Sequence, residues 1–217
     1  MTDPPPLRLV AFDMDGTLVD VMSSWAEVHR HFRDNNDEAL RAFMSDQIDD
    51  VEFTRRDLQL WRRHKPDISL GDLRRILADV PLMPGARELF EALHAKGLRT
   101  AIVSGGLDIL AERLQKELSV DVALANGFET ENGGRLVRGI IRVPVKRKEQ
   151  VLRELQTRMR IGPQETASVG NSEIDVGLFR ASRLSVAFVP DDELVRRHAS
   201  VVVEERDLRR LIPILAP

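Results

Sequence analysis

The sequence contains no cysteine among its 217 residues. This absence excludes disulfide scaffolds, thiol nucleophiles and thiolate metal sites. No apolar run approaches the ~18 residues that a membrane-spanning helix needs, which predicts no membrane partner. The segment Met1–Pro6 is polar and rich in proline, so we expect no signal peptide. Together these features predict a soluble, cytoplasmic protein.

An excess of charge of one sign is also lacking. Lys and Arg number 32 against 35 Asp and Glu, which gives a net charge of −3 and a pI of about 6.0. We therefore predict a salt-bridged surface and no nucleic-acid partner. No metal-site spacing relates the histidines, and we expect them at the surface or in the helical cap described below: His29, His31, His64, His94 and His198.

Short apolar runs alternate with helical patterns along most of the chain. Strands that alternate with helices predict a doubly wound, Rossmann-like α/β fold with a parallel sheet covered on both faces. The predicted strands are residues 7–12, 98–103, 166–169, 184–189 and 200–203, with a weaker candidate at 121–125. The predicted helices between them are residues 86–96, 107–118 and 145–159.

Residues 20–81 differ from this pattern because they contain no convincing strand. We predict a small helical cap domain there, inserted into an α/β core of residues 1–19 and 82–217. The expected cap helices are residues 24–32, 38–45, 53–63 and 71–77. A hairpin turn is predicted at Asn132-Gly133-Gly134.

The pattern Asp13-Met14-Asp15-Gly16-Thr17 directly follows the first predicted strand. Residues two apart on an extended chain point the same way, so the two carboxylates crowd together. A bound divalent cation relieves their repulsion, and oxygen ligands with few competing nitrogens suit magnesium rather than zinc. A strand that ends in an ordinary Asp-Gly turn produces the same pattern without any function.

Two further polar segments follow predicted strands. Ser104-Gly105-Gly106 offers a hydroxyl and exposed N–H groups that can hold phosphate oxygens, or it is only a glycine-rich connection. The segment with Asn171 and Asp175 offers further oxygen ligands, or it is only a helix N-terminus that favours acids. Because ligands bind beyond the carboxyl ends of parallel strands, three segments direct polar groups at one region.

A lysine on an inner helix face is the fourth signal. The spacing of positions 148, 152, 155 and 159 places Lys148 on one face with Leu152, Leu155 and Met159. That face is apolar and packs inward, so the lysine needs an anion there. A phosphorylated aspartate would be such an anion. The alternative is a lysine that extends along the core edge to water.

These four segments, in this order, resemble the haloacid dehalogenase superfamily of phosphohydrolases from Leu7 to nearly the C-terminus. The similarity is greatest to the phosphoserine phosphatase branch, which carries a small helical cap after its first motif. The runs 103–108 and 205–211 are typical of that branch. The resemblance implies a magnesium-dependent phosphatase that hydrolyses a small phosphorylated metabolite, a phosphomonoester, through an aspartyl-phosphate intermediate.

The resemblance also implies a role for each matching residue. Asp13 would attack phosphorus, and Asp15 would protonate the leaving alcohol and then activate water. Ser104, Gly105 and Lys148 would bind the phosphoryl group, and the lysine would also neutralise its charge. The metal side of the site would consist of Asp13, Asp15 through its backbone carbonyl, Asn171 and Asp175.

The chain departs from the family pattern at several positions. Asn171 stands where the family usually has aspartate, so we expect weaker magnesium binding. Met22 and Leu60 stand where the branch has a glutamate and an arginine that recognise serine. With Trp25 and Phe53 they form a candidate, less polar substrate pocket, or they are only the packing of the cap.

Two alternatives to hydrolysis remain open. The same intermediate serves a phosphotransferase that uses an acceptor other than water. A non-catalytic binding protein with this fold is the other alternative, and Asn171 is its only support. The sequence does not indicate the oligomeric state.

Overall fold

The computed structural model describes residues 5–217, which form an α/β fold around one seven-stranded sheet. The strand order is β4-β3-β2-β1-β5-β6-β7, and every neighbouring pair is parallel except β3 and β4. The predicted fold class is confirmed. The strands are β1 (Leu9–Phe12), β2 (Arg99–Leu107), β3 (Val122–Glu131), β4 (Arg135–Ile140), β5 (Thr166–Gly170), β6 (Leu184–Phe188) and β7 (Val201–Val203).

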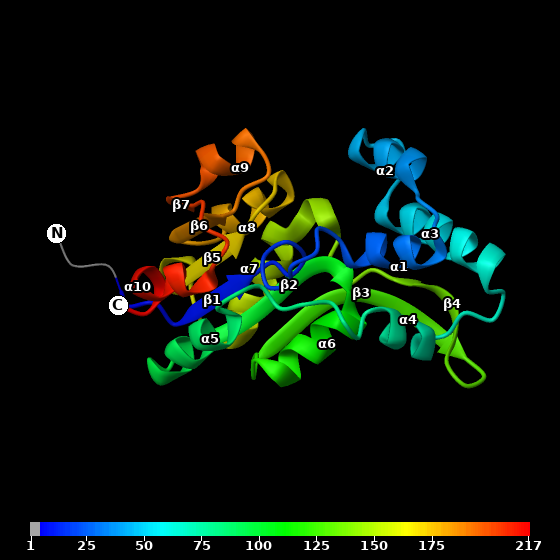
Figure 1. The fold of residues 1–217 in the computed structure, drawn as a ribbon. Coiled ribbons are helices and arrows are strands. Elements are labelled where there is room, and N and C mark those ends of the chain that lie inside the picture. The colour runs from blue at the N-terminus through cyan, green and yellow to red at the C-terminus, as the bar shows by residue number, and fades with distance from the viewer. Residues whose placement is uncertain (1–4) are drawn as a thin grey trace.

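Helices cover both faces of the sheet. Side chains along the central strand β1 point alternately to the two faces, and they are apolar on both. Leu9 and Ala11 of β1 join one apolar cluster with α7, α8 and α9, and Val10 and Phe12 join the other with α5, α6 and α10. Figure 1 shows these helices on either side of the sheet. They are α5 (Ala86–Ala95), α6 (Asp108–Glu117), α7 (Lys148–Met159), α8 (Val176–Arg180), α9 (Glu193–His198) and α10 (Ile212–Leu215).

Two strands are longer than their apolar runs predict. β2 continues through Ser104-Gly105-Gly106, which we expected in a turn, and α6 begins directly after it. The pairing of β2 with β3 shifts register between Val103 and Leu107, so the glycine-rich segment is an irregular strand end. β3 runs beyond the sheet core into the predicted hairpin with β4. Its turn residues have positive φ at Asn132, Gly133 and Gly134.

Four helices lie between β1 and α5, in the segment that we assign to a cap. The chain enters and leaves this segment side by side, because Val19 and Leu82 form an antiparallel bridge. The division into core and cap domains stays a proposal. The four helices are α1 (Ser24–Phe32), α2 (Asp37–Met44), α3 (Asp50–His64) and α4 (Leu70–Ile76).

The β3–β4 hairpin supports this helical segment. The N–H of Leu70 donates to the carbonyl of Gly134 at 2.9 Å, and the N–H of Leu136 donates to the carbonyl of Ile68 at 2.9 Å. Figure 1 shows α3 and α4 beside β4, away from the two described chain ends. The helical segment is therefore joined to the sheet at two places, the strand pair at its base and the hairpin.

The hairpin also approaches α3 closely. Gly139 of β4 faces Thr54 of α3, and a Cβ at this glycine would collide with the threonine methyl group. A guanidinium nitrogen of Arg62 donates to the carbonyl of Leu136 at 2.5 Å. The hairpin surface is thus fitted to this helix.

No helix within residues 5–217 is long and apolar enough to cross a membrane. The predicted cytoplasmic location stays a prediction. We expected no signal peptide in Met1–Pro6, and the first four residues of that segment lie outside the described part of the chain.

Candidate active site

Two aspartates and a lysine from three separate elements form a buried cluster at the carboxyl edge of the sheet. Asp13 follows β1, Lys148 is the first residue of α7, and Asp175 follows β5. Lys148 Nζ lies 2.6 Å from Asp13 Oδ1 and 2.7 Å from Asp175 Oδ1. The exposed fractions are 6%, 3% and 0% for Asp13, Lys148 and Asp175. The inward lysine predicted from helical spacing is therefore held between two carboxylates.

Burial and the neighbouring charges shift the pKa values of Asp13 and Lys148. Burial and the neighbouring charge of Asp175 raise the pKa of Asp13 to about 7, although Lys148 opposes the rise. Burial acts to lower the pKa of Lys148, but the two carboxylates outweigh it and raise that pKa. The lysine thus keeps its positive charge beside the candidate nucleophile.

Asp15 is hydrogen-bonded at one oxygen only. Its Oδ2 accepts from the N–H of Ser24 at 2.8 Å and from the Ser24 hydroxyl at 2.8 Å. Its Oδ1 is buried and has no hydrogen-bond partner within residues 5–217. Burial raises the pKa of Asp15, and the bonds from Ser24 oppose that rise. A carboxyl group with a raised pKa and a free oxygen can carry and deliver a proton.

Ser24 connects Asp15 to a second strand end. Its hydroxyl accepts from the N–H of Leu107 at 2.9 Å while it donates to Asp15. Gly106 packs against the same groups: a Cβ there would lie 2.7 Å from Asp15 Oδ2 and 2.8 Å from Ser24 Oγ. The first residue of α1 thereby positions the candidate acid, and only glycine fits beside it.

The segment Ser104–Gly105 is held by side chains on both sides. The Ser104 hydroxyl accepts from the N–H of Gly106 at 3.1 Å. The carbonyl of Gly105 accepts from Trp25 Nε1 at 3.0 Å and from Asn126 Nδ2 at 3.2 Å. The orientation of the Gly105–Gly106 peptide is therefore fixed where a phosphoryl group is expected.

Asn171 lies against the first motif. Its Oδ1 accepts from the Thr17 hydroxyl at 3.2 Å, and its side chain packs on Gly16. The backbone N–H groups of Asn171 and Ser172 donate to Asp175 Oδ2 at 2.9 and 3.1 Å. Both oxygens of Asp175 are therefore engaged by protein donors. This geometry favours Asp175 as a residue that positions Lys148 and the loop rather than as a direct metal ligand.

Three residues that line one cavity offer oxygen ligands that suit a magnesium ion. They are the carboxylate of Asp13, the backbone carbonyl of Asp15 and Oδ1 of Asn171, which are hard ligands of the kind that magnesium uses. No group of three or more His, Cys, Asp or Glu within the described chain is arranged to hold a metal. Water and substrate phosphate would therefore complete the coordination, as is common for magnesium.

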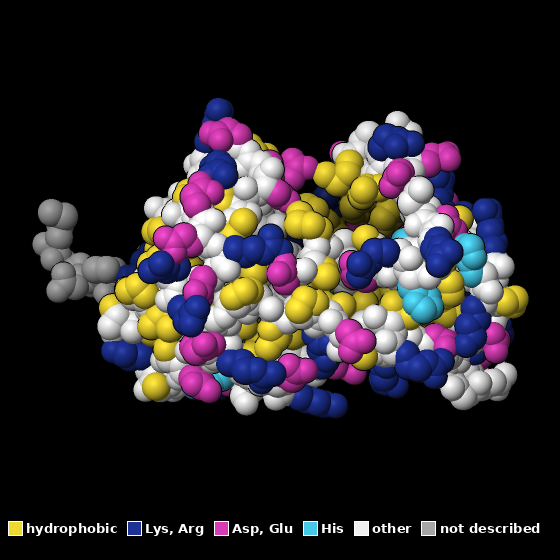
Figure 2. Space-filling view, in the orientation of Figure 1, with side chains coloured by type: hydrophobic (Ala, Val, Ile, Leu, Met, Phe, Trp, Pro, Cys, Tyr) yellow, Lys and Arg dark blue, Asp and Glu magenta, His cyan; other side chains and the backbone are white. Residues whose placement is uncertain are grey.

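A cavity of about 820 Å³ extends from this cluster into the helical segment. Figure 2 shows a hollow bordered by hydrophobic side chains between the regions of α9 and α2. Among the predicted pocket residues, Met22, Trp25 and Phe53 line the cavity, and Leu60 does not. Of the other predicted site residues, Asp175 does not line the cavity, and six do: Asp13, Asp15, Ser104, Gly105, Lys148 and Asn171.

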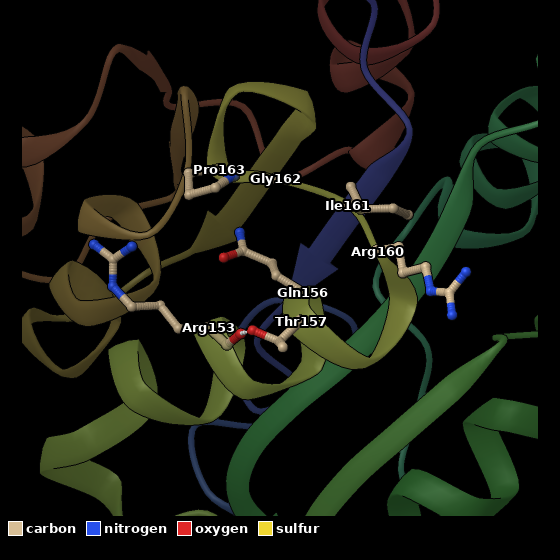
Figure 3. Close-up of a pocket in the computed structure, with 7 residues that line it drawn as sticks. All are labelled: Arg153, Gln156, Thr157, Arg160, Ile161, Gly162 and Pro163. Atoms are coloured by element: carbon tan, nitrogen blue, oxygen red, sulfur yellow. Dashed lines mark hydrogen bonds between the residues drawn. The ribbon is translucent and has the colours of Figure 1, made fainter.

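A second, shallower cavity of about 440 Å³ lies at the opposite end of α7. Figure 3 shows its lining, with the Thr157 hydroxyl directed at the carbonyl of Arg153, 2.9 Å away. Gln156 Nε2 already donates to Thr166 Oγ1 at 3.0 Å and to the Ala181 carbonyl at 2.7 Å. These contacts give the cavity a structural explanation, and we assign it no site.

Several residues of the site were missed by sequence reasoning. Ser24, Asn126 and Asp57 carry no local pattern that marks them, because each acts on a segment distant in the chain. His29, which we expected at the surface or in the cap, is buried in the helical segment, and its Nε2 lies 2.7 Å from Asp57 Oδ1. Only the packing of α1 against α3 brings these two residues together.

A family model described as haloacid dehalogenase-like hydrolase matches residues 10–180. The chain belongs to this hydrolase family. The predicted family and enzyme class are therefore confirmed, and the aspartates, the lysine and the asparagine described above all lie within the matched residues.

Curated relatives are named phosphoserine phosphatases. That of Idiomarina loihiensis is 32% identical over 185 residues, which cover 83% of this chain and 81% of the relative. That of Albidiferax ferrireducens is 29% identical over 225 residues, which cover 98% and 93%. The predicted resemblance to this branch is confirmed.

Solved structures share the fold. One described as a phospho-aspartyl intermediate analogue of phosphoserine phosphatase has a TM-score of 0.80 at 23% identity, over 97% of this chain and 100% of its own. A second structure, described as a HAD family hydrolase from Salmonella enterica, has a TM-score of 0.84 at 22% identity, over 98% of this chain and 72% of its own.

Proposed function

We propose that the protein is a magnesium-dependent phosphatase that hydrolyses a small phosphomonoester through an aspartyl-phosphate on Asp13. The observation that carries this proposal is the buried contact of Asp13 with Lys148, beside an Asp15 that keeps one oxygen free. The names of the curated relatives support the same reaction class.

In the first step an oxygen of Asp13 would bond to phosphorus while the bond from phosphorus to the ester oxygen breaks. Asp15 would give its proton to that oxygen, so that a neutral alcohol leaves. In the second step water would attack the phosphorus, and Asp15 would accept a proton from the water. The bond between phosphorus and Asp13 would break, which restores the carboxylate and releases phosphate.

The remaining residues would position and neutralise the transferred group. Lys148 would balance the charge of the phosphoryl oxygens, and Ser104 and Gly105 would donate hydrogen bonds to them. Magnesium, held by Asp13, Asp15 and Asn171, would supply further positive charge to the same oxygens.

Phosphoserine itself is a candidate substrate because the curated relatives carry that name. Met22 and Leu60, however, stand where the related branch has the charged residues that recognise serine. We therefore propose a small phosphorylated metabolite and treat phosphoserine as one compound to test.

The test is hydrolysis of p-nitrophenyl phosphate with magnesium and with a chelator. Asp13→Asn removes the nucleophile, and Asp67→Asn is the matched control because Asp67 is exposed and does not line the cavity. We expect turnover that requires magnesium, is lost in Asp13→Asn and persists in Asp67→Asn. Equal turnover in all three proteins would overturn the proposal.

A further inference from the structure

A buried pair of polar residues lies in the cavity wall, in the helical segment. His29 Nε2 of α1 is 2.7 Å from Asp57 Oδ1 of α3, and Asn36 Nδ2 donates to the same oxygen at 2.6 Å. The exposed fractions of His29 and Asp57 are 5% and 1%. All three residues line the same cavity as Asp13 and Lys148.

One of the two carboxylate oxygens of Asp57 lacks a hydrogen-bond partner among the described residues. Both contacts are made to Oδ1, and Oδ2 is buried without a hydrogen-bond partner within residues 5–217. His29 Nδ1 is in the same condition. Leaving a buried polar atom unpaired is costly, so such atoms call for an explanation. An ionised carboxylate oxygen only accepts hydrogen bonds, so the partner of Asp57 Oδ2 in that state is a donor.

The cavity wall as a whole is largely apolar, although Arg30, Arg33, Asp34 and Asp37 also line it. The rings of Phe43 and Phe53 pack with centroids 5.2 Å apart, and both line the cavity. Met22, Leu40 and Met44 line it as well and are exposed. Exposed apolar side chains around a hollow mark a surface that binds an apolar group.

The size of the cavity also indicates a substrate larger than phosphoserine. Its volume of about 820 Å³ lies in the upper part of the ~300–1,000 Å³ that small-molecule sites occupy. A phosphorylated amino acid as small as phosphoserine leaves most of that space unused. Because the phosphoryl site and the buried pair line the same cavity, a longer substrate would contact both.

We propose that the substrate is a phosphomonoester of an amphipathic alcohol, with an apolar body against Phe43 and Phe53 and a distal hydroxyl or amino group that donates to Asp57. This inference rests on the proposed phosphatase function and names its substrate class. Asp57 receives the donor, and His29 and Asn36 hold the carboxylate in place.

The experiment compares kcat/KM for substrates that separate the two features. Phenyl phosphate has the apolar body alone and phosphoethanolamine has the amine alone, whereas phosphoserine has an amine and a carboxylate but no apolar body. A series of phenyl phosphates with a para aminoalkyl arm of one, two or three carbons has both. A hydrogen bond to a charged group corresponds to roughly tenfold or more in kcat/KM, so we expect the best arm to exceed phenyl phosphate by that factor.

Variants of Asp57 and His29 test whether these residues cause the preference for the aminoalkyl arm. In Asp57→Asn and in His29→Gln, we expect the ratio of kcat/KM between the best arm and phenyl phosphate to fall toward one. His31→Gln is the matched control on the same helix, because His31 is exposed and does not line the cavity. Melting curves identify a variant that fails to fold, and the second variant then decides the result.

The outcomes are distinguishable from failure of the proposed function. Preference for phosphoserine or phosphoethanolamine over every aryl phosphate overturns the inference and leaves the phosphatase reaction intact. An unchanged ratio in a folded Asp57→Asn or His29→Gln protein does the same. Absence of magnesium-dependent turnover of p-nitrophenyl phosphate removes the proposed function and this inference with it.

Discussion

Replacing Ser24 with alanine tests whether the first residue of α1 positions the general acid. Ser24→Ala removes the hydroxyl that donates to Asp15 Oδ2 at 2.8 Å and accepts from the N–H of Leu107 at 2.9 Å. The backbone bond from residue 24 to Asp15, also 2.8 Å, remains. The variant therefore weakens the hold on the acid without removing the acid.

The expected loss depends on the leaving group. A hydrogen bond to a charged group contributes ~1.5–3 kcal/mol, which corresponds to roughly 10- to 100-fold in rate. An alkyl phosphate needs a proton on its leaving oxygen, so its kcat should fall by about that factor. p-Nitrophenolate leaves readily as an anion, so kcat for p-nitrophenyl phosphate should change by no more than a few-fold.

The pH profile supplies a second readout. Burial raises the pKa of Asp15, and the bonds from Ser24 oppose the rise. Removing one of these bonds raises the pKa of Asp15 further. Since the first step needs protonated Asp15, the alkaline limb of kcat for the alkyl phosphate should move to higher pH.

Ser23→Ala is the matched control. Ser23 caps α1 by accepting from the N–H of Ala26 at 3.3 Å, and its loss costs about 1 kcal/mol of stability. It makes no contact with Asp15 among the hydrogen bonds of the described residues. Equal losses for both substrates in Ser24→Ala, or the same split in Ser23→Ala, would refute the reasoning.

Three further predictions concern the metal site, the nucleophile and a glycine. Asn171→Asp adds a carboxylate to the proposed metal site, so the magnesium concentration that half-maximally raises the melting temperature should fall about tenfold or more; no change would exclude Asn171 as a ligand. The pKa of Asp13 is raised from 3.8 to about 7, so its contribution to stability is full below pH ~4 and is lost as pH rises to ~7. In metal-free protein, the melting temperature of Asp13→Asn minus that of the wild type should therefore increase between pH 4 and 8, and a flat difference would contradict the shift. Gly106→Ala places a Cβ 2.7 Å from Asp15 Oδ2 and 2.8 Å from Ser24 Oγ, so kcat for an alkyl phosphate should drop by about tenfold or more; an unchanged kcat would show that the loop adapts.

Features set by local spacing were predictable from the sequence. The end of the apolar run places Asp13 at the edge of the sheet, and the 4-3-4 spacing turns Lys148 inward, where it meets Asp13. The four helices of the inserted segment follow their apolar periodicity to within three residues at each end. Strand ends and helix faces depend on neighbours in the chain, and one sequence contains that information.

Features set by packing between distant segments were not predictable. His29 and Asp57 are 28 residues apart, and only the rotation of α1 and α3 about their axes brings them into contact. The same rotation decides that Thr54 and Asp57 line the cavity and that Leu60 does not. The expected glycine-rich turn became a strand end because pairing with β3 resumes at Leu107.

The contact between the helical segment and the β3–β4 hairpin has a consequence for protein engineering and for the evolution of this chain. A chimera that imports residues 20–81 from a relative would set a foreign α3 against this hairpin, whose Gly139 accommodates Thr54. The hydrogen bonds at Ile68 and Leu70 would also need a turn of the same length. The unit that must be exchanged or inherited together in this chain is therefore discontinuous, because it comprises the helical segment and a hairpin encoded later in the sequence.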